Sequence, residues 1–300
     1  MTRESGNLRH WLPESAAFAR MDAYRAIRVS GPDAEALLQG QFSNDISTLH
    51  TNPGQLSSYN SPKGRVLAFL RVLRHADAWW LVVDAGILDV FLQRLRMFVL
   101  RSKVSIEPAP EIAGLAVTGP AAAARLHVAG LPAPGPGEAV VHDGCVFLGV
   151  PGPLPRVEIH GPVEALPELK MEQASSADLA RWDILCGLPR IVEGNRDAHV
   201  AQHINLDELG AISFRKGCYT GQEIIARMKY LGKIKKRMMV LAGHDAHVGD
   251  TIRTADDRSA GEVVNVADAD DGQLILAVVN LDDQDSLLNV NGNALSILRP

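Results

Sequence analysis

The residues best suited to chemistry lie in one continuous stretch, at positions 215–237. Within it, Cys218 precedes a segment with the features of a helix start. Thr220 and Glu223 have the spacing of a capping box, in which each side chain satisfies a free backbone N–H at the helix start. The unpaired N–H groups of a helix start and the neighbouring Lys216 favour a thiolate, which acts as a nucleophile or a metal ligand. A lone Cys is most often a small buried hydrophobe, and the residues alone support the two interpretations of Cys218 about equally.

Two chemistries other than ligand binding are open to Cys218. It could attack a substrate with His199 or His203 as base and Asp207 as the orienting acid, although nothing in the spacing makes this triad specific. It could instead supply one ligand to an iron–sulfur cluster that a partner shares or receives, because a cluster usually needs four. The three cysteines lie far apart in sequence, so we predict no resident metal site.

Length and composition indicate an ordinary globular protein. The 300 residues predict two or three domains, and 46% hydrophobic and 22% charged residues allow a sizeable core. A net charge of −5 argues against nucleic-acid binding by the molecule as a whole. Sparse, odd-numbered cysteines favour a reducing cytoplasm. We see neither a signal-peptide pattern nor an apolar run long enough for a bilayer, so we expect a cytoplasmic protein without a membrane partner.

Hydrophobic periodicity and turn residues predict mixed α and β structure after a lead-in at residues 1–20. Strands are predicted at 23–29, 55–59, 66–73, 79–83, 104–107, 114–118, 140–150 and 156–160, with 66–73 and 79–83 forming a hairpin. Helices are predicted at 32–40, 87–100, 120–130 and 177–186. The strands predicted at 238–242, 261–266, 274–279 and 294–298 indicate a small barrel or sandwich.

Three segments carry a resemblance to a known family. The run Lys216-Gly217-Cys218-Tyr219-Thr220-Gly221-Gln222-Glu223 resembles the K-G-C-[FY]-x-G-Q-E signature of the YgfZ family. Residues 39–46 resemble its Q-G-Q-x-x-x-D-[VI] segment, and residues 61–65 resemble its K-G-[KR] turn. That family belongs to a folate-binding superfamily with the glycine-cleavage T-protein, an aminomethyltransferase, and with mitochondrial iron–sulfur assembly factors.

The resemblance implies an α+β fold, a T-protein-like three-domain ring. The folate-binding domain would comprise residues 1–110 and 175–237, with a ferredoxin-like middle domain inserted at 111–174. A C-terminal β-barrel at 238–300 would close the ring. Relatives hold a folate in the central cavity, so the implied cofactor is tetrahydrofolate or a derivative.

The resemblance also implies site residues. Those expected to bind folate are Tyr24, Asp45, Leu179, Trp182, Gln202 and Asn205. Relatives can carry their Trp where this chain has Leu179, and the T-protein has a pterin-binding Glu where it has Asn205. An ordinary core role for Trp182 and a backbone-shaping role for Gly217 and Gly221 are the simpler interpretations from the residues alone.

The strand after the turn at residues 61–65 argues against the T-protein reaction. The T-protein has a catalytic Asp there, whereas residues 64–69 contain no acid. We therefore expect no aminomethyl transfer and leave other turnover open. The implied function is a folate-binding protein that helps assemble or repair iron–sulfur enzymes and thereby supports tRNA modification, with those enzymes or assembly proteins as partners. The alternatives are a folate-dependent one-carbon transferase or demethylase, and an RNA-binding or scaffold module.

Six cations without an acid among them end the stretch: Arg227, Lys229, Lys233, Lys235, Lys236 and Arg237. Such a run can hold phosphates, RNA or a folate polyglutamate tail, or it can be a solvated face. Only Tyr219 and Tyr230 could stack on bases nearby, so the sequence favours the solvated or tail-binding interpretation over direct nucleic-acid binding.

Overall fold

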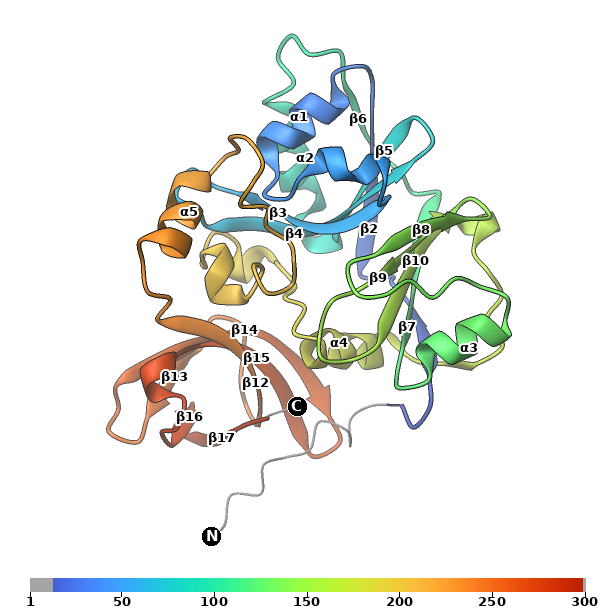
Figure 1. Ribbon diagram of the computed structural model, residues 1–300. Helices are drawn as coiled ribbons and strands as arrows, with labels where there is room; N and C mark the ends of the chain where they lie inside the picture. The colour runs from blue at the N-terminus through green and yellow to red at the C-terminus, as the bar shows by residue number, and fades with distance from the viewer. Residues whose placement is uncertain (1–12, 299–300) are drawn as a thin grey trace.

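The computed structural model describes residues 13–298, which form three lobes around a shared centre (Figure 1). Each lobe is built on its own sheet. The first twelve residues of the expected lead-in lie outside the described part of the chain. The α+β class and the closed C-terminal barrel predicted from the sequence are confirmed.

The first lobe holds a five-stranded antiparallel sheet in the order β3-β4-β5-β2-β6. Its elements are β2 (Tyr24–Ser30), α1 (Ala34–Gln41), η2 (Ile46–His50), β3 (Gly54–Asn60), β4 (Val66–His75), β5 (Ala78–Asp84), η3 (Ala85–Ile87), α2 (Leu88–Arg96) and β6 (Ser105–Pro108). The predicted hairpin is confirmed, with Arg74 opposite Trp79. All of β3 and β5 is buried, because α1, α2 and the neighbouring lobe cover this sheet (Figure 1).

The second lobe is a six-stranded sheet in the order β11-β1-β7-β10-β9-β8. Its elements are β1 (Ala17–Arg20), β7 (Ile112–Thr118), α3 (Ala122–Val128), β8 (Ala139–His142), β9 (Cys145–Gly149), β10 (Arg156–Pro162), η4 (Val163–Ala165) and β11 (Glu172–Gln173). The lead-in prediction is wrong for β1, which pairs with β7 and buries Ala17 and Ala19. The single strand predicted at 140–150 is a hairpin, because Asp143 and Gly144 adopt positive φ and turn the chain.

The third lobe is a closed barrel in the order β12-β15-β14-β13-β16-β17. Its elements are β12 (Lys236–Gly243), β13 (Thr251–Thr254), β14 (Ser259–Ala269), β15 (Gly272–Asn280), η7 (Leu281–Asp283), β16 (Leu288–Val290) and β17 (Asn293–Ile297). Four of these strands match the predicted runs. The sequence analysis missed β13 and β16, which are too short for a clear alternating pattern.

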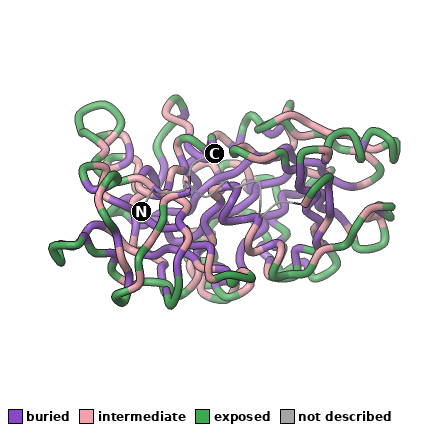
Figure 2. Tube along the Cα trace, turned by 90° about the horizontal axis from the view of Figure 1, so that it is seen from below, coloured by how far each residue is buried: buried purple, intermediate pink, exposed green. Residues whose placement is uncertain are grey.

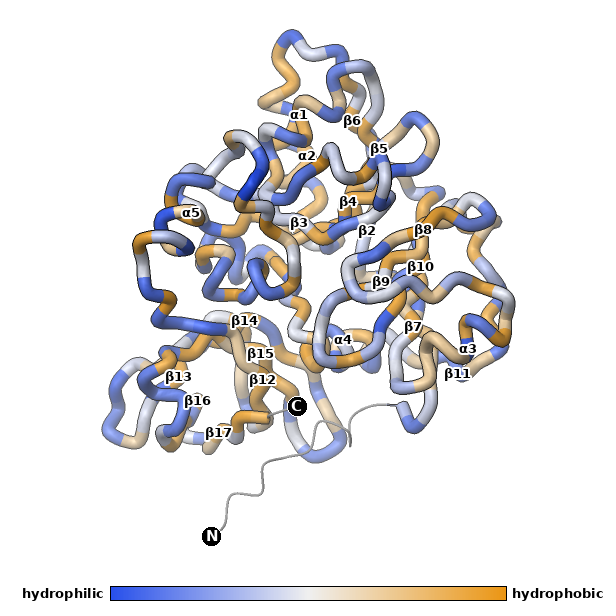
Figure 3. Tube along the Cα trace, in the orientation of Figure 1, coloured by the Kyte–Doolittle hydropathy of each residue, from blue (hydrophilic) through white to orange (hydrophobic). Residues whose placement is uncertain are grey.

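Helix α4 (Ser176–Leu185) joins the lobes. It begins with a capping box between Ser175 and Asp178, and it contacts β1 of the second lobe and β14 and β15 of the barrel. Its Leu179 and Trp182 belong to one hydrophobic cluster that includes residues of the first sheet and the barrel. Figure 2 shows buried residues running through the middle of the molecule, and Figure 3 shows hydrophobic residues along the strands. A continuous core therefore ties the lobes together.

The remaining short elements follow α4 in the sequence and precede the barrel. They are η5 (Glu193–Asn195), η6 (Ala201–Ile204) and α5 (Gln222–Tyr230). Across residues 13–298, no helix combines the length and apolar character needed to cross a membrane.

Candidate functional site

The turn that carries Cys218 is fixed by glycine packing, not by the predicted capping box. Helix α5 begins at Gln222, its N-cap is Gly221 at φ +83°, and no side chain caps it. A Cβ atom at Gly221 would lie 2.5 Å from the Ser61 carbonyl oxygen. The backbone of the 61–65 turn therefore occupies the space beside the cap, so Thr220 precedes the helix and Glu223 remains exposed.

Lys216 anchors the same turn from the other side. Its side chain is buried, and Nζ donates to the carbonyl oxygens of Gln39, Phe42 and Asn44 at 2.7, 2.8 and 2.8 Å. Burial lowers the pKa of Lys216 to about 8, although the nearby Asp45 carboxylate opposes this shift. The lysine thus joins the cysteine segment to residues 39–44, which the sequence resemblance had identified separately.

Asp45 organises its own loop. Its Oδ1 accepts from the Ser47 backbone N–H at 3.1 Å and hydroxyl at 2.7 Å, and from Gln39 Nε2 at 2.9 Å. The hydrogen bond from the Ser47 hydroxyl is the main reason that the pKa of Asp45 lies below its usual value. Each of these contacts stabilises the loop on which Lys216 is anchored.

Cys218 is exposed between two anchored neighbours. The Tyr219 ring is buried, and its centre lies 5.3 Å from Lys216 Nζ. Burial raises the pKa of its hydroxyl. On the helix side, Gln222 Nε2 donates to the Gly217 carbonyl at 3.4 Å. Cys145 and Cys186 are free but buried. Cys218 is therefore the accessible thiol on this rigid turn.

The histidine-based triad is not assembled. Both carboxylate oxygens of Asp207 accept from Arg237, at 2.7 and 3.0 Å, so this acid binds a guanidinium and orients no imidazole. His199 and His203 instead line a pocket of about 280 Å³ beside Lys236. Burial, together with nearby cations, lowers the pKa of each histidine to about 4.

The residues expected to bind folate do not line a single cavity. Leu179 and Trp182 are buried in the core, and Tyr24 borders a small pocket of about 220 Å³ beside β7. Gln202 is buried, and its Nε2 donates to the Ile225 carbonyl of α5 at 2.6 Å. Asn205 borders a different cavity, described below.

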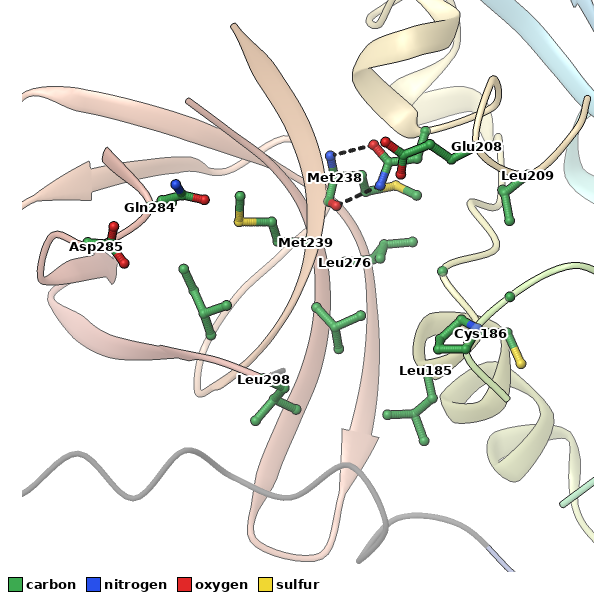
Figure 4. A pocket seen from close by; sticks show the side chains of 16 residues that line it. Leu185, Cys186, Glu208, Leu209, Met238, Met239, Leu276, Gln284, Asp285 and Leu298 are labelled. Carbon is green, nitrogen blue, oxygen red and sulfur yellow. Dashed lines mark hydrogen bonds between the residues drawn. The ribbon is translucent and has the colours of Figure 1, made fainter. Parts of the chain in front are cut away.

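That cavity has a volume of about 650 Å³ and lies between the end of α4, residues 205–209 and the barrel (Figure 4). Its apolar wall includes Leu185, Met238, Leu276 and Leu298. Its polar lining includes Asn205, Glu208, Gln284 and Asp285. The volume and the mixture of a large apolar wall with a few polar groups suit an organic ligand.

Asn205 holds the edge of this cavity in place. It adopts a left-handed backbone conformation at φ +56°. Its Nδ2 donates to the Met238 carbonyl at 2.8 Å, and its Oδ1 accepts from the Met238 N–H at 3.1 Å. The amide thus pairs with strand β12, while the Glu208 side chain nearby is 60% exposed and can meet a ligand.

The sequence analysis missed a ring of buried charges at the junction of the first two lobes and α4. Arg71 on β4 makes two bonds to Glu158 on β10, at 2.8 and 2.7 Å. Arg156 bridges Glu158 at 2.8 Å and Asp183 at 2.6 Å. Asp183 accepts from the Tyr24 hydroxyl at 2.7 Å, and the Arg71 guanidinium lies 4.8 Å from the centre of the Tyr24 ring.

Glu158 stays charged in this ring because of its partners. Burial alone would raise the pKa of Glu158, but Arg71 and Arg156 hold it well below its ordinary value. Burial, reinforced by the Asp183 carboxylate, raises the pKa of the Tyr24 hydroxyl. The hydroxyl is therefore a hydrogen-bond donor inside the protein, and Tyr24 has a structural role that its sequence position did not reveal.

The cationic run divides into two parts. Arg237 is paired with Asp207 and also contacts Glu208. The other five cations are exposed and have no acid partner within residues 13–298, and we call them the cationic surface: Arg227, Lys229, Lys233, Lys235 and Lys236. Over the same residues, no group of three or more His, Cys, Asp or Glu side chains is placed to hold a metal.

Known proteins resemble the chain in sequence and in fold, although no family model matches it. It is 33% identical over 269 residues to the "tRNA-modifying protein YgfZ" of Cronobacter sakazakii, covering 85% of this chain and 82% of that protein. It is 32% identical over 292 residues to the protein of the same name from Klebsiella pneumoniae, covering 92% and 89%.

A solved structure matches the whole architecture. The glycine cleavage system aminomethyltransferase T from Bartonella henselae superposes with a TM-score of 0.69, covering 100% of this chain and 90% of that protein, at 18% identity. This match supports the T-protein-like fold predicted from the resemblance. The level and extent of the sequence identities, together with the cysteine turn, show the family: the chain belongs to the YgfZ family.

Proposed function

We propose that this protein supports tRNA modification by helping to assemble or repair iron–sulfur enzymes, with a reduced folate bound in the cavity between α4 and the barrel. The name of its relatives supports the tRNA-linked role. The main observation in favour of the iron–sulfur role is the exposed Cys218, which lies on a turn that Lys216 and Gly221 hold in place. We expect tetrahydrofolate or a derivative as cofactor.

The cavity fits a folate in size and chemistry. Its volume of about 650 Å³ lies within the range of organic ligand sites, and Leu276 and Met238 offer apolar surface to a fused ring. The exposed Glu208 carboxylate would accept hydrogen bonds from the amino and ring N–H groups of a pterin. When bound, the folate would supply one-carbon chemistry, while Glu208 and the apolar wall would orient it.

Cys218 would contact the iron–sulfur cargo. A single thiolate supplies one of the usual four ligands, so the protein would share a cluster with a partner for a limited time and would not store one. The rigid turn keeps the thiol pointing outward, where a partner protein can reach it. Aminomethyl transfer is not favoured, because β4 contains no carboxylate to orient a folate nitrogen.

The first test is an anaerobic calorimetric titration with tetrahydrofolate. We expect Glu208→Gln to weaken binding and the exposed Glu164→Gln, which lies in the second lobe, to leave it unchanged. Cys218→Ala should bind folate normally, because Cys218 does not line the cavity. Absence of binding by the unaltered protein would refute the folate part of the proposal.

The second test measures modified nucleosides in bulk tRNA from cells that lack their own copy of the gene. We expect the unaltered protein and Cys145→Ala to restore modification, and Cys218→Ala to fail. Cys145 is the matched control because it is buried and remote from the turn. Full restoration by Cys218→Ala would remove the thiol from the mechanism.

A further inference from the structure

We propose that the cationic surface, together with the pocket beneath Lys236, binds the phosphate backbone of RNA directly. This inference builds on the proposed tRNA-linked function and names the molecule that the protein would touch. The sequence analysis favoured a different interpretation of these cations, as a solvated face or as a site for a folate polyglutamate tail. Three observations carry it: unpaired charge, exposed aromatic surface and a pocket lined by cations.

Within residues 13–298 the five cations have no acid partner, although acids are plentiful elsewhere in the sequence. The chain has a net charge of −5, so the residues outside this surface have a net charge of −10. Arg237, at the end of the run, takes two acid partners, whereas the five members of the surface take none within the described residues. Positive charge concentrated on a negative protein would attract a polyanion to this face and repel it elsewhere.

The surface follows α5 and the connection into β12, between the first lobe and the barrel (Figure 1). Residues 231–235 can span about 16 Å, which is several phosphate steps of a nucleic-acid strand. Tyr230 and Leu231 lie among the cations and are 65% and 84% exposed. The Tyr230 and Phe214 rings form an edge-to-face pair with 6.2 Å between their centres. This contact holds the Tyr230 ring in place, and its exposed part still offers surface to an unpaired base.

The surface ends at the pocket of about 280 Å³ that contains His199 and His203. Lys236 and Arg65 also line it, and Arg65 is fixed by Nη1 bonds to the carbonyls of Asp197 and Ala198 at 3.2 and 2.7 Å. His199 is only 6% exposed, and its Nε2 makes no hydrogen bond in the described structure. A phosphate oxygen would find two cations and imidazole nitrogens there.

One acid opposes this binding. Glu262 lines the pocket, is 43% exposed, and places its Oε1 3.5 Å from His199 Nε2. Its charge offsets one of the two pocket cations. The geometry therefore predicts that removing this acid would strengthen RNA binding, an effect that damage to the fold would not produce.

RNA fits this surface better than an acidic protein does. Lysines act on phosphates as point charges and need no defined partner geometry. An acidic protein would offer no base to stack on Tyr230, whereas single-stranded tRNA segments do. The combination of lysines, an exposed aromatic ring and a cation-lined pocket is therefore the chemistry of a nucleic-acid strand.

The test measures binding of an unmodified tRNA transcript by fluorescence anisotropy over a range of KCl concentrations. We expect Lys233→Gln/Lys235→Gln to weaken binding and to reduce the slope of log K against log salt by about 1.4 to 1.8. Tyr230→Ser should weaken binding by about 5-fold to 150-fold, because it removes the ring on which a base would stack. Glu262→Gln should tighten binding by roughly 1.5-fold to 5-fold.

The matched control is Arg28→Gln/Lys103→Gln, which removes the same charge from exposed positions on β2 and just before β6 in the first lobe. We expect its affinity and salt slope to equal those of the unaltered protein. Equal affinity in Lys233→Gln/Lys235→Gln and the unaltered protein would overturn the proposal. Equally strong binding of a polyglutamate peptide of similar charge would also overturn it, in favour of an acidic protein partner.

A tetrahydrofolate titration of the same variants separates this inference from the proposed function. The cavity between α4 and the barrel contains none of the substituted residues. Folate binding should therefore persist in every variant that loses RNA binding. Failure of RNA binding with intact folate binding would count against this inference alone.

Discussion

Gly221 packs on Gly64: a Cβ atom added to Gly221 would lie 3.0 Å from the Cα of Gly64 and 2.5 Å from the carbonyl oxygen of Ser61. Gly221 also has a φ of +83°, a conformation that residues with a side chain adopt only at a cost of about 1–2 kcal/mol. We predict that Gly221→Ala lowers the free energy of unfolding by at least this amount, as measured by urea denaturation.

Gly217 provides the control for that substitution. It lies in the same turn, its φ is not in the left-handed region, and a Cβ there would meet no atom within 4 Å. Gly217→Ala should therefore change the free energy of unfolding by less than about 0.5 kcal/mol. Similar losses in the two variants would contradict the packing argument.

The different burial of the three cysteines predicts a simple thiol count. Cys218 is exposed, whereas Cys145 and Cys186 are buried. Burial also raises the pKa of Cys186 to about 11, which disfavours its reactive thiolate. A disulfide reagent should therefore modify one thiol rapidly in the native protein and three after unfolding in guanidinium chloride.

The variant Cys218→Ala identifies the reactive group in that count. It should show no rapidly modified thiol in the native state and two after unfolding. Cys145→Ala should retain the rapid phase. Rapid modification of two thiols in the native protein would show that a second cysteine is accessible.

The sequence predicted the elements with long, regular patterns and missed those whose existence depends on tertiary pairing. The hairpin of β4 and β5 and the helix α4 carry their own hydrophobic periodicity, so local pattern was sufficient. Strand β1 has four residues and exists because β7 lies beside it. The capping box failed for a related reason, since contact with the 61–65 turn sets the start of α5.

The site was predicted in the same uneven way. The motif singled out Lys216 and Cys218 but could not show that one is buried under carbonyl groups and the other exposed. Arg71 and Glu158 were not predicted, because an isolated charge in a strand usually marks a solvent-facing position. They meet 87 residues apart, where two sheets face each other, and a sequence pattern does not encode such a contact.

His199 and His203 predict a loss of stability in acid. Burial and the charges of Arg65 and Lys236 lower the pKa of both to about 4 in the folded protein, against 6.5 for a free histidine. Between pH 4 and 6.5 the unfolded chain binds more protons, so the free energy of unfolding falls as the pH falls through this window. We expect a loss on the order of 1–3 kcal/mol for each histidine.

The variant His199→Gln/His203→Gln isolates that contribution. It lacks both titrating groups, so its free energy of unfolding in urea should fall less between pH 6.5 and pH 4.5 than that of the unaltered protein. Carboxylates titrate in both proteins, so the comparison cancels their contribution to the pH dependence. Identical pH dependence would mean that neither histidine is shielded from protons in the folded state.

The buried ring of Arg71, Glu158, Arg156, Asp183 and Tyr24 predicts the largest effect of a single substitution. Arg71 and Glu158 are 1% and 0% exposed, so water cannot replace a lost partner. Arg71→Met should lower the free energy of unfolding by about 3–5 kcal/mol, because it removes two hydrogen bonds from the buried Glu158 carboxylate and leaves it with Arg156 and His160. Arg28→Met, on an exposed face of β2, should lower the free energy of unfolding by less than about 0.5 kcal/mol in the same urea titration.

Since Arg71 does not line the folate cavity, Arg71→Met should keep its folate affinity at urea concentrations below its unfolding transition. Equal stability of the two variants would mean that the ring contributes little to joining the first two lobes and α4.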